Sequence, residues 1–352
     1  MIFFKKYFLA FFLIFQIVIL QVLQFFPAFV EKTYSISWYQ SSSNFLRFIL
    51  GKIPFSVGDI IYGILILWLL ISMYKNWKSI WKQKLLLVVN FISVFYFLFH
   101  TLWAFNYYRV PLFEKMKIER DYSDADLLNF TKKLIVKTNQ IQFQITKNDS
   151  TKIVFPYTHE QTFTMDLNGY KNLAKQYLFF EYKNLSVKKS LFSLPLTYMG
   201  FGGYLNPFTN EAQVNYLMPM YNLPMTSNHE MAHQMGFGSE SECNFIGFLA
   251  TIKNEDLYFK YSGYATALRY CLANWEARNP EILKQLLPTI NSGILKNYQE
   301  SQDFWKQYET PIETGFKIFY DNFLKINQQE DGLESYNKFV NLLVGYYRDR
   351  DF

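Results

Sequence analysis

Three long apolar runs near the N-terminus constrain this chain more than any other feature. They cover residues 7–30, 57–74 and 85–105 of the 352, and each approaches or exceeds the ~20 residues that an α-helix needs to cross a bilayer. We therefore predict three transmembrane helices and contact with a lipid bilayer. A cleaved signal peptide is a poorer interpretation of the first run, because the run is too long and lacks a small-residue cleavage site.

Lysines around these runs predict the orientation of the chain. Lys5 and Lys6 precede the first run, and four lysines lie between residues 75 and 84, in the short connection from the second run to the third. Because Lys and Arg favour cytoplasmic connections, both clusters belong inside. We expect a multi-pass protein of the inner (cytoplasmic) membrane, with everything after about Tyr108 in the periplasm or outside the cell. The connection at 31–56 is expected to lie along the outer interface.

The net charge of +6 is unevenly distributed along the chain. Residues 1–110 contain 10 lysines and arginines against 2 acidic residues, whereas residues 111–352 contain 25 against 27. The positive excess therefore follows from membrane topology, which argues against a nucleic-acid-binding role. The two cysteines, Cys243 and Cys271, form either one disulfide or two buried thiols, and they are too few for a thiolate zinc site.

The chemistry of the chain is indicated by the sequence His-Glu-Met-Ala-His at residues 229–233. Residues four apart lie on one face of a helix, so His229 and His233 can bind one zinc ion, Zn²⁺. The adjacent Glu230 can then act as the general base toward a water in the open coordination position. Two surface histidines on an ordinary helix are the alternative.

A catalytic zinc site needs a third protein ligand, and two glutamates follow the second histidine closely. Gly236 and Gly238 predict the end of the first helix, and Ser239 with Glu242 forms the Ser-x-x-Glu capping-box pattern at the start of the next. That role for Glu242 leaves Glu240 as the predicted third ligand, with Glu242 as the alternative.

Three segments around this motif resemble a bacterial family of membrane-anchored proteins known as DUF3810. They are residues 202–211, residues 223–226 and the stretch from His-Glu-Met-Ala-His-Gln to the Glu-x-Glu-x-Asn-Phe at 240–245. The pattern from Glu240 to Asn244 is also similar to a signature of HtpX-like and ImmA/IrrE-like gluzincins, in which the first glutamate binds zinc. The resemblance implies a zincin-like metallopeptidase domain and favours Glu240 over Glu242.

Residues 1–110 are expected to form the membrane domain and residues 111–352 a domain outside the cytoplasm. The predicted architecture is three transmembrane helices followed by an α+β, zincin-like, mainly helical domain with a helical C-terminal lobe from about Tyr258. Helices are predicted at 124–138, capped by Ser123, at 169–182, 261–278 and 280–292, and extended segments at 185–187, 194–198 and 211–218. We expect the strand at 211–218 to be a sheet edge on which an extended peptide pairs. Gly202, Gly203 and Pro207 belong either to a loop at the cleft rim or to an ordinary hairpin.

Other polar residues receive weaker predictions. A zinc peptidase also needs a donor for the developing oxyanion. The candidates that follow the motif most closely are Tyr261, Tyr264 and Arg269. His159 is expected at the surface or packed. His100 lies inside the third apolar run, so we expect it either to be functional or to pair with Asn90 or Gln16.

Together these features predict a membrane-anchored zinc metallopeptidase that hydrolyses peptide bonds of a peptide or protein substrate outside the cytoplasm. One alternative is a catalytically inactive zincin-fold sensor or scaffold of the cell envelope, and another is a purely structural membrane protein. An intramembrane protease is disfavoured, because the motif lies more than 100 residues beyond the last apolar run, between polar segments. Nothing in the sequence identifies the substrate.

Overall fold

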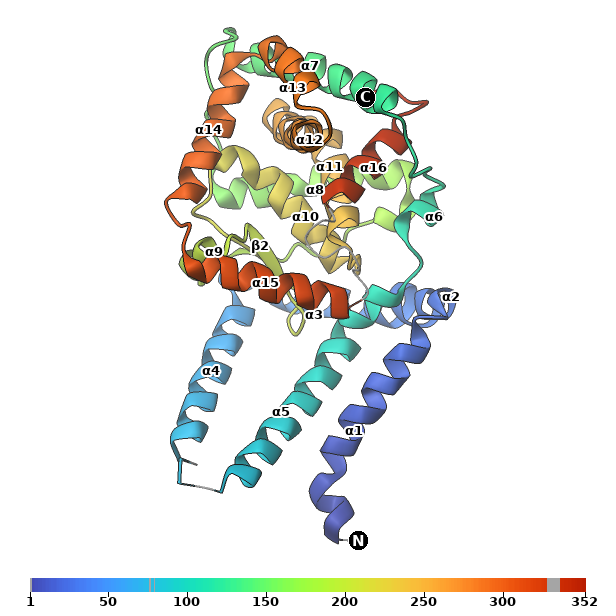
Figure 1. Cartoon of the computed structure of the whole chain (residues 1–352), viewed down its shortest axis with the longest axis vertical. Coiled ribbons are helices and arrows are strands. Elements are labelled where there is room, and N and C mark those ends of the chain that lie inside the picture. The colour runs from blue at the N-terminus through green and yellow to red at the C-terminus, as the bar shows by residue number, and fades with distance from the viewer. Residues whose placement is uncertain (1, 76, 79, 328–335) are drawn as a thin grey trace.

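Three long apolar helices project from one end of a mainly helical domain (Figure 1). The computed structural model of the chain describes residues 2–75, 77–78, 80–327 and 336–352. Within these residues, three helices are long and apolar enough to cross a membrane: α1 (Ile2–Leu23), α4 (Val57–Lys75) and α5 (Trp81–Leu102). They coincide with the three predicted runs, although α1 ends before residue 30. The N-terminus and the lysine-rich ends of α4 and α5 lie far from the domain (Figure 1).

The connection between the first two spans is itself helical. Pro27 begins α2 (Pro27–Val30), which continues through a π-helical segment (Glu31–Trp38) into α3 (Tyr39–Leu50). Proline suits a first helical turn, because its missing N–H would have no partner there. This helical stretch lies where the spans meet the domain (Figure 1).

The domain after the third span contains eleven further α-helices among the described residues. They are α6 (Leu112–Met116), α7 (Asp124–Thr146), α8 (His159–Gln176), α9 (Ser193–Met199), α10 (Leu223–Gln234), α11 (Glu240–Lys253), α12 (Leu257–Arg278), α13 (Pro280–Leu286), α14 (Ser292–Lys306) and α15 (Pro311–Ile326), with an eleventh, α16 (Tyr336–Tyr346), after the gap. Short 3₁₀ turns lie at Ala104–Tyr108, Leu178–Phe180, Met220–Asn222 and Leu287–Thr289. The predicted helical C-terminal part corresponds to α12–α16, except that residues 328–335 lie outside the described residues.

A small sheet lies beside α10. In the described part of the chain it has three strands in the order β1 (Val187–Lys189), β3 (Glu211–Val214), β2 (Gly203–Asn206). β1 pairs parallel to β3, with Val187 opposite Ala212, and β2 pairs antiparallel, with Gly203 opposite Val214. The strand predicted at 211–218 is therefore shorter than expected, because β3 ends at Val214. The prediction that this strand forms a sheet edge is wrong, because β3 is hydrogen-bonded on both sides.

Two more boundaries differ from the predictions. Residues 194–198, predicted as extended, form helix α9. Helix α8 was predicted from residue 169 but begins at His159, where the Thr158 hydroxyl accepts from the N–H of Gln161 and the Gln161 side chain bonds back to the N–H of Thr158. This capping box satisfies two backbone groups that a helix start otherwise leaves free. The capping of α7 by Ser123 is confirmed.

Helix α11 lies at the centre of the hydrophobic core. Its apolar run from Phe245 to Ile252 is buried and packs against α8, α10, α12 and α16. Cys243 and Cys271 are both free and buried. Of the two alternatives for the cysteines, the structure therefore shows two buried thiols.

Helix α4 is fixed to the sheet by two carboxylates. Glu211 of β3 accepts from the N–H groups of Val57 and Gly58, at 3.2 and 2.6 Å, and so caps the start of α4. In return, Asp59 of α4 accepts from the Ser190 hydroxyl at 2.9 Å and from the Tyr204 hydroxyl of β2. A carboxylate at a helix N-terminus is favoured by the helix dipole. The sheet is thus attached directly to the second span.

Candidate metal centre

The His-Glu-Met-Ala-His sequence occupies the last two turns of α10. Pro224 lies in the first turn of this helix, and the helix ends at Gln234, with Met235 as its C-cap. Gly236 has φ +85°, a left-handed conformation that a side chain disfavours, so a glycine here lets the chain leave the helix and turn toward α11. This turn returns Glu240, the first residue of α11, to the two histidines.

Three predicted ligand atoms converge at this point. The Nε2 atoms of His229 and His233 are 3.1 Å apart. One carboxylate oxygen of Glu240 lies 3.2 Å from Nε2 of His229, and the other lies 3.6 Å from Nε2 of His233. All three residues place a ligand atom within 4.8 Å of the others, which makes them a candidate metal-binding group.

The other nitrogen of each imidazole is held by an acceptor. Nδ1 of His229 is 2.9 Å from the side-chain oxygen of Asn244, and Nδ1 of His233 is 2.8 Å from the carbonyl oxygen of Phe237. A proton on each Nδ1 satisfies these acceptors and leaves each Nε2, which faces the same point, able to bind a metal ion. Asn244 and Phe237 orient the rings as outer partners orient metal-binding histidines.

The chemistry of this donor set suits zinc. Two imidazole nitrogens and one carboxylate oxygen are a common set of protein ligands in catalytic zinc sites, which keep a fourth position for water. Without a positive charge between them, two nitrogen lone pairs and a carboxylate at these separations repel one another. Without a metal, a proton supplies that charge: although burial opposes it, Cys243 and Glu240 raise the pKa of His233 well above its usual value, and the resulting imidazolium, together with His229, outweighs burial and holds the pKa of Glu240 well below its usual value.

Glu242 points away from this centre. Its carboxylate accepts from the N–H of Leu112 at 2.6 Å, and burial raises its pKa to about 7. The predicted Ser-x-x-Glu capping box is wrong: α11 begins after Ser239, but the Ser239 hydroxyl contacts Ser241 and caps no backbone group. The prediction of Glu240 as the third ligand required Glu242 to be bonded elsewhere, and it is. Its partner is the first residue of α6, however, rather than the backbone of its own helix.

Glu230, the predicted general base, lies between the ligands and the sheet. It is 4% exposed, its Oε2 atom has no hydrogen-bond partner among the described residues, and burial raises its pKa. A Cβ atom on Gly203 of β2 would lie 2.7 Å from Oε1 of Glu230, so only a glycine permits the strand to approach this closely. Gly203 therefore belongs to the site, whereas Pro207 lies in the β2–β3 turn, where the neighbouring Phe208 contacts Tyr62 and Phe95 of the spans.

A tyrosine that sequence reasoning missed completes the centre. The hydroxyl of Tyr320, on α15, donates to Oε1 of Glu240 at 2.7 Å. Of the candidates proposed from sequence, Tyr261 donates instead to Asn297, and Tyr264 is buried against Phe248 and Phe352. Tyr320 lies 80 residues after Glu240. Nothing in its local sequence distinguishes it from the rest of the 27 tyrosines of the chain.

The two remaining histidines lie away from this centre. Nε2 of His159 donates to the Tyr216 carbonyl at 3.1 Å near the surface, as expected. Nδ1 of His100 contacts the Tyr96 carbonyl one turn earlier in α5, while Gln16 bonds to Ser93 rather than to His100. The prediction that Gln16 pairs with His100 is therefore wrong.

The C-terminal end of α10 is capped by side chains from the membrane-proximal part of the chain. The Trp103 indole N–H donates to the His233 carbonyl at 3.0 Å, and the Tyr39 hydroxyl and the Arg47 guanidinium donate to the Gln234 carbonyl at 3.0 and 2.8 Å. Arg109 donates to the Gly236 carbonyl at 2.8 Å. The last carbonyls of a helix have no partner within it, so these four donors satisfy them.

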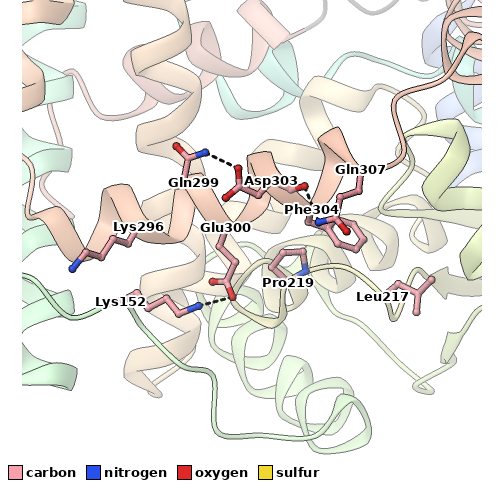
Figure 2. A pocket seen from close by; sticks show the side chains of 9 residues that line it. All are labelled: Lys152, Leu217, Pro219, Lys296, Gln299, Glu300, Asp303, Phe304 and Gln307. Atoms are coloured by element: carbon pink, nitrogen blue, oxygen red, sulfur yellow. Dashed lines mark hydrogen bonds and ion pairs between the residues drawn. The ribbon is translucent and has the colours of Figure 1, made fainter.

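A surface hollow lies elsewhere, between α14 and the segment before α10 (Figure 2). Its volume is about 600 Å³, and several of its polar side chains bond to one another: Lys152 pairs with Glu300 at 2.8 Å, and the Gln299 amide donates to Asp303 at 2.7 Å. No histidine or cysteine lines it. Because the His-Glu group brings ligand atoms together and this hollow does not, the group, rather than the hollow, is the candidate metal centre.

Comparison with known proteins gives one match. A family model described as "Protein of unknown function (DUF3810)" matches residues 34–344. The matched region begins after the first span and includes the second and third spans and the whole candidate centre. No curated protein and no solved structure matches the chain.

Proposed function

We propose that this chain, which belongs to the DUF3810 family, is a membrane-anchored zinc metallopeptidase that hydrolyses peptide bonds outside the cytoplasm. One observation supports this most strongly: His229, His233 and Glu240 converge within 4.8 Å, and Glu230, on the same helix as the histidines, has a buried carboxylate oxygen without a partner. The lysine clusters remote from the domain support the location.

When bound by these three residues, a zinc ion supplies a Lewis acid that polarises a carbonyl oxygen and lowers the pKa of water from ~15.7 toward about 7. The residues of the chain supply the rest. Glu230 takes the proton of the attacking water and passes it to the leaving amine. Its burial raises its pKa, which makes it a better proton acceptor than an exposed carboxylate.

Two further groups have positions that suit the reaction. The Tyr320 hydroxyl, at 2.7 Å from Glu240, can turn to the carbonyl oxygen of a substrate and stabilise its developing negative charge. β2 pairs only with β3 among the described residues, so its outer edge can pair with an extended peptide. Gly203 places that edge against Glu230. β2 thus takes the role that the sequence assigned to residues 211–218.

The test uses the full chain purified in detergent, because residues before 111 cap α10. We expect about one zinc per chain, lost in His229→Ala, His233→Ala and Glu240→Ala and retained in Glu242→Gln. The decisive variant is Glu230→Gln, which should keep the zinc and the melting temperature but cleave a peptide library ~10² times more slowly than wild type.

Two results would contradict the proposal. Stoichiometric zinc in both histidine variants would remove the metal site as described. The second result has three parts: both wild type and Glu230→Gln bind zinc, neither cleaves peptides, and both replace the deleted gene equally well in cells. This result would favour the alternative of a sensor or scaffold with a zincin-like site.

A further inference from the structure

Helix α15 has an apolar stripe that the rest of the described structure leaves largely uncovered. Ile312, Phe316, Phe319, Phe323 and Ile326 recur at the spacing that places residues on one side of a helix. Ile312, Phe319 and Ile326 are 60%, 63% and 70% exposed. Such a stripe on the surface of a protein marks contact with a membrane or a partner.

The opposite sides of α15 have different surroundings. Leu324 is fully buried, and Tyr320 packs its ring on Phe201 with centroids 4.9 Å apart and donates to Glu240. On a third side Thr314 and Lys317 are exposed, together with one apolar residue, Ile318, at 61%. One helix therefore presents three faces: one toward the metal centre, one toward water and one uncovered apolar face.

The position of α15 identifies what covers the apolar face. The helix runs across the end of the domain from which α4 and α5 project (Figure 1). Phe323 contacts Phe99, in the last turn of α5, with ring centroids 6.0 Å apart. The apolar stripe of α15 is thus continuous with the exposed apolar surface of a membrane span, at the level where that span ends.

We infer that α15 is a membrane-surface helix, whose apolar stripe lies in the interfacial layer of the bilayer that α5 crosses while its inner face holds Tyr320 over Glu240. Amphipathic helices at such positions bury their apolar face about 5–10 Å into the boundary between headgroups and acyl chains. The metal centre is then covered, on the side toward the bilayer, by a helix that lipid holds in place. This inference goes beyond the proposed function and needs neither bound metal nor peptidase activity.

A fluorescent probe on α15 tests this. The full chain with Phe319→Cys is labelled with the environment-sensitive dye NBD and reconstituted in phosphatidylcholine–phosphatidylglycerol vesicles. Cys243 and Cys271 are buried, so the new thiol reacts selectively. We expect blue-shifted emission, quenched by about half or more when the vesicles contain a phosphatidylcholine spin-labelled near its headgroup, since the side chain lies within that layer.

Thr314→Cys provides the matched control, because it lies on the same helix and faces water. Its probe should emit as in water and resist the lipid quencher. The inference is overturned if the Phe319 probe emits as in water, or if its emission is blue-shifted but insensitive to the spin-labelled lipid, which would indicate a protein partner or a second copy. If Phe319→Cys lowers the melting temperature, Ile312→Cys gives the same test at the other end of the stripe.

Discussion

The three spans and the segments that join them to the domain are both N-terminal and mostly helical, but they contact the rest of the protein in different ways. The spans expose large apolar side chains, such as Ile64 and Leu70 at 61% and 59%, and it is the start of α4 that is bonded to the sheet. The connector, which we define as residues 27–56 and 103–111, also exposes apolar side chains, but it buries two arginines: Arg47 is 3% exposed and Arg109 is 8% exposed. The spans determine where the protein is held, whereas the connector forms part of its candidate centre.

The reason lies at the end of α10. A helix leaves its last carbonyl groups without partners, and burying them unpaired is costly. Here the donors come from Tyr39, Arg47, Trp103 and Arg109, all of them in the connector. A protein cut at residue 111 would lose all four. The predicted domain boundary at residue 110 is therefore not a boundary for the candidate metal centre.

The largest effect is expected for Arg47→Met. Arg47 donates to the carbonyls of Gln234 and Lys183 and to the Asn210 side chain. Methionine keeps much of the apolar stem but removes every donor, so we expect a loss of about 3 kcal/mol in the free energy of unfolding. Thermal unfolding of the full chain in detergent measures it.

Arg278→Met is the matched control for this variant. Arg278 has a side chain that is 39% exposed and pairs with Asp124 at the surface, where ion pairs contribute little. Equal melting temperatures for Arg47→Met and Arg278→Met would show that the connector is no more important to the fold than the outer surface.

The same contrast explains what the sequence could and could not predict. The spans follow from length and composition, which need no knowledge of partners. The prediction of His229, His233 and Glu230 follows from helix periodicity. The prediction of Glu240 rests on a capping box at Ser239 and Glu242 that does not form and on the resemblance to gluzincins, so this residue is reached in part through a wrong premise. Arg47 and Trp103 act on backbone carbonyls 187 and 130 residues away. A carbonyl is present in every residue, so no sequence pattern marks such a partner.

Errors in the small sheet have a related cause. Residues 211–214 alternate as a strand should, but whether a strand is central or at an edge depends on pairing with residues 187–189 and 203–206. Residues 194–198 contain a proline and β-favouring residues, yet their helix is fixed by tertiary contacts, including packing against α15. Local propensity yields to tertiary context at both places.

An intermediate effect is expected for Glu31→Gln. Glu31 accepts two bonds of 2.8 Å from Arg109 and one of 2.8 Å from Lys115. Burial would raise its pKa, but the two cations outweigh burial, so the pKa lies below its ordinary value of 4.5. The ion pair therefore stabilises the folded chain fully above about pH 4.5 and is lost as the pH falls through the lower, folded-state pKa.

Glu31→Gln should cost about 2 kcal/mol at neutral pH. The difference from wild type should shrink below pH 4.5, as unfolding curves at several pH values would reveal. Glu281→Gln serves as a control, because its ion pair with Lys284 is exposed. A constant difference between wild type and Glu31→Gln across this range would mean that the charge of Glu31 does not hold Arg109 against the Gly236 carbonyl.

The smallest effect gives the most direct comparison of the two regions, since one substitution can be made in both. Trp103→Phe in the connector removes the indole donor to the His233 carbonyl and should cost about 1 kcal/mol. Trp68→Phe in α4 changes a side chain that is 51% exposed on the apolar surface of a span, where a smaller aromatic ring serves nearly as well. We expect the melting temperature of Trp68→Phe in detergent to match that of wild type. Only Trp103→Phe should weaken zinc binding, because His233 lies on the turn that Trp103 caps. Equal losses of stability in the two variants, or a larger loss for Trp68→Phe, would show that aromatic packing rather than this hydrogen bond explains the role of Trp103. The proposed difference between spans that anchor the protein and a connector that forms the site would then be wrong at Trp103, where the connector lies closest to the candidate metal centre.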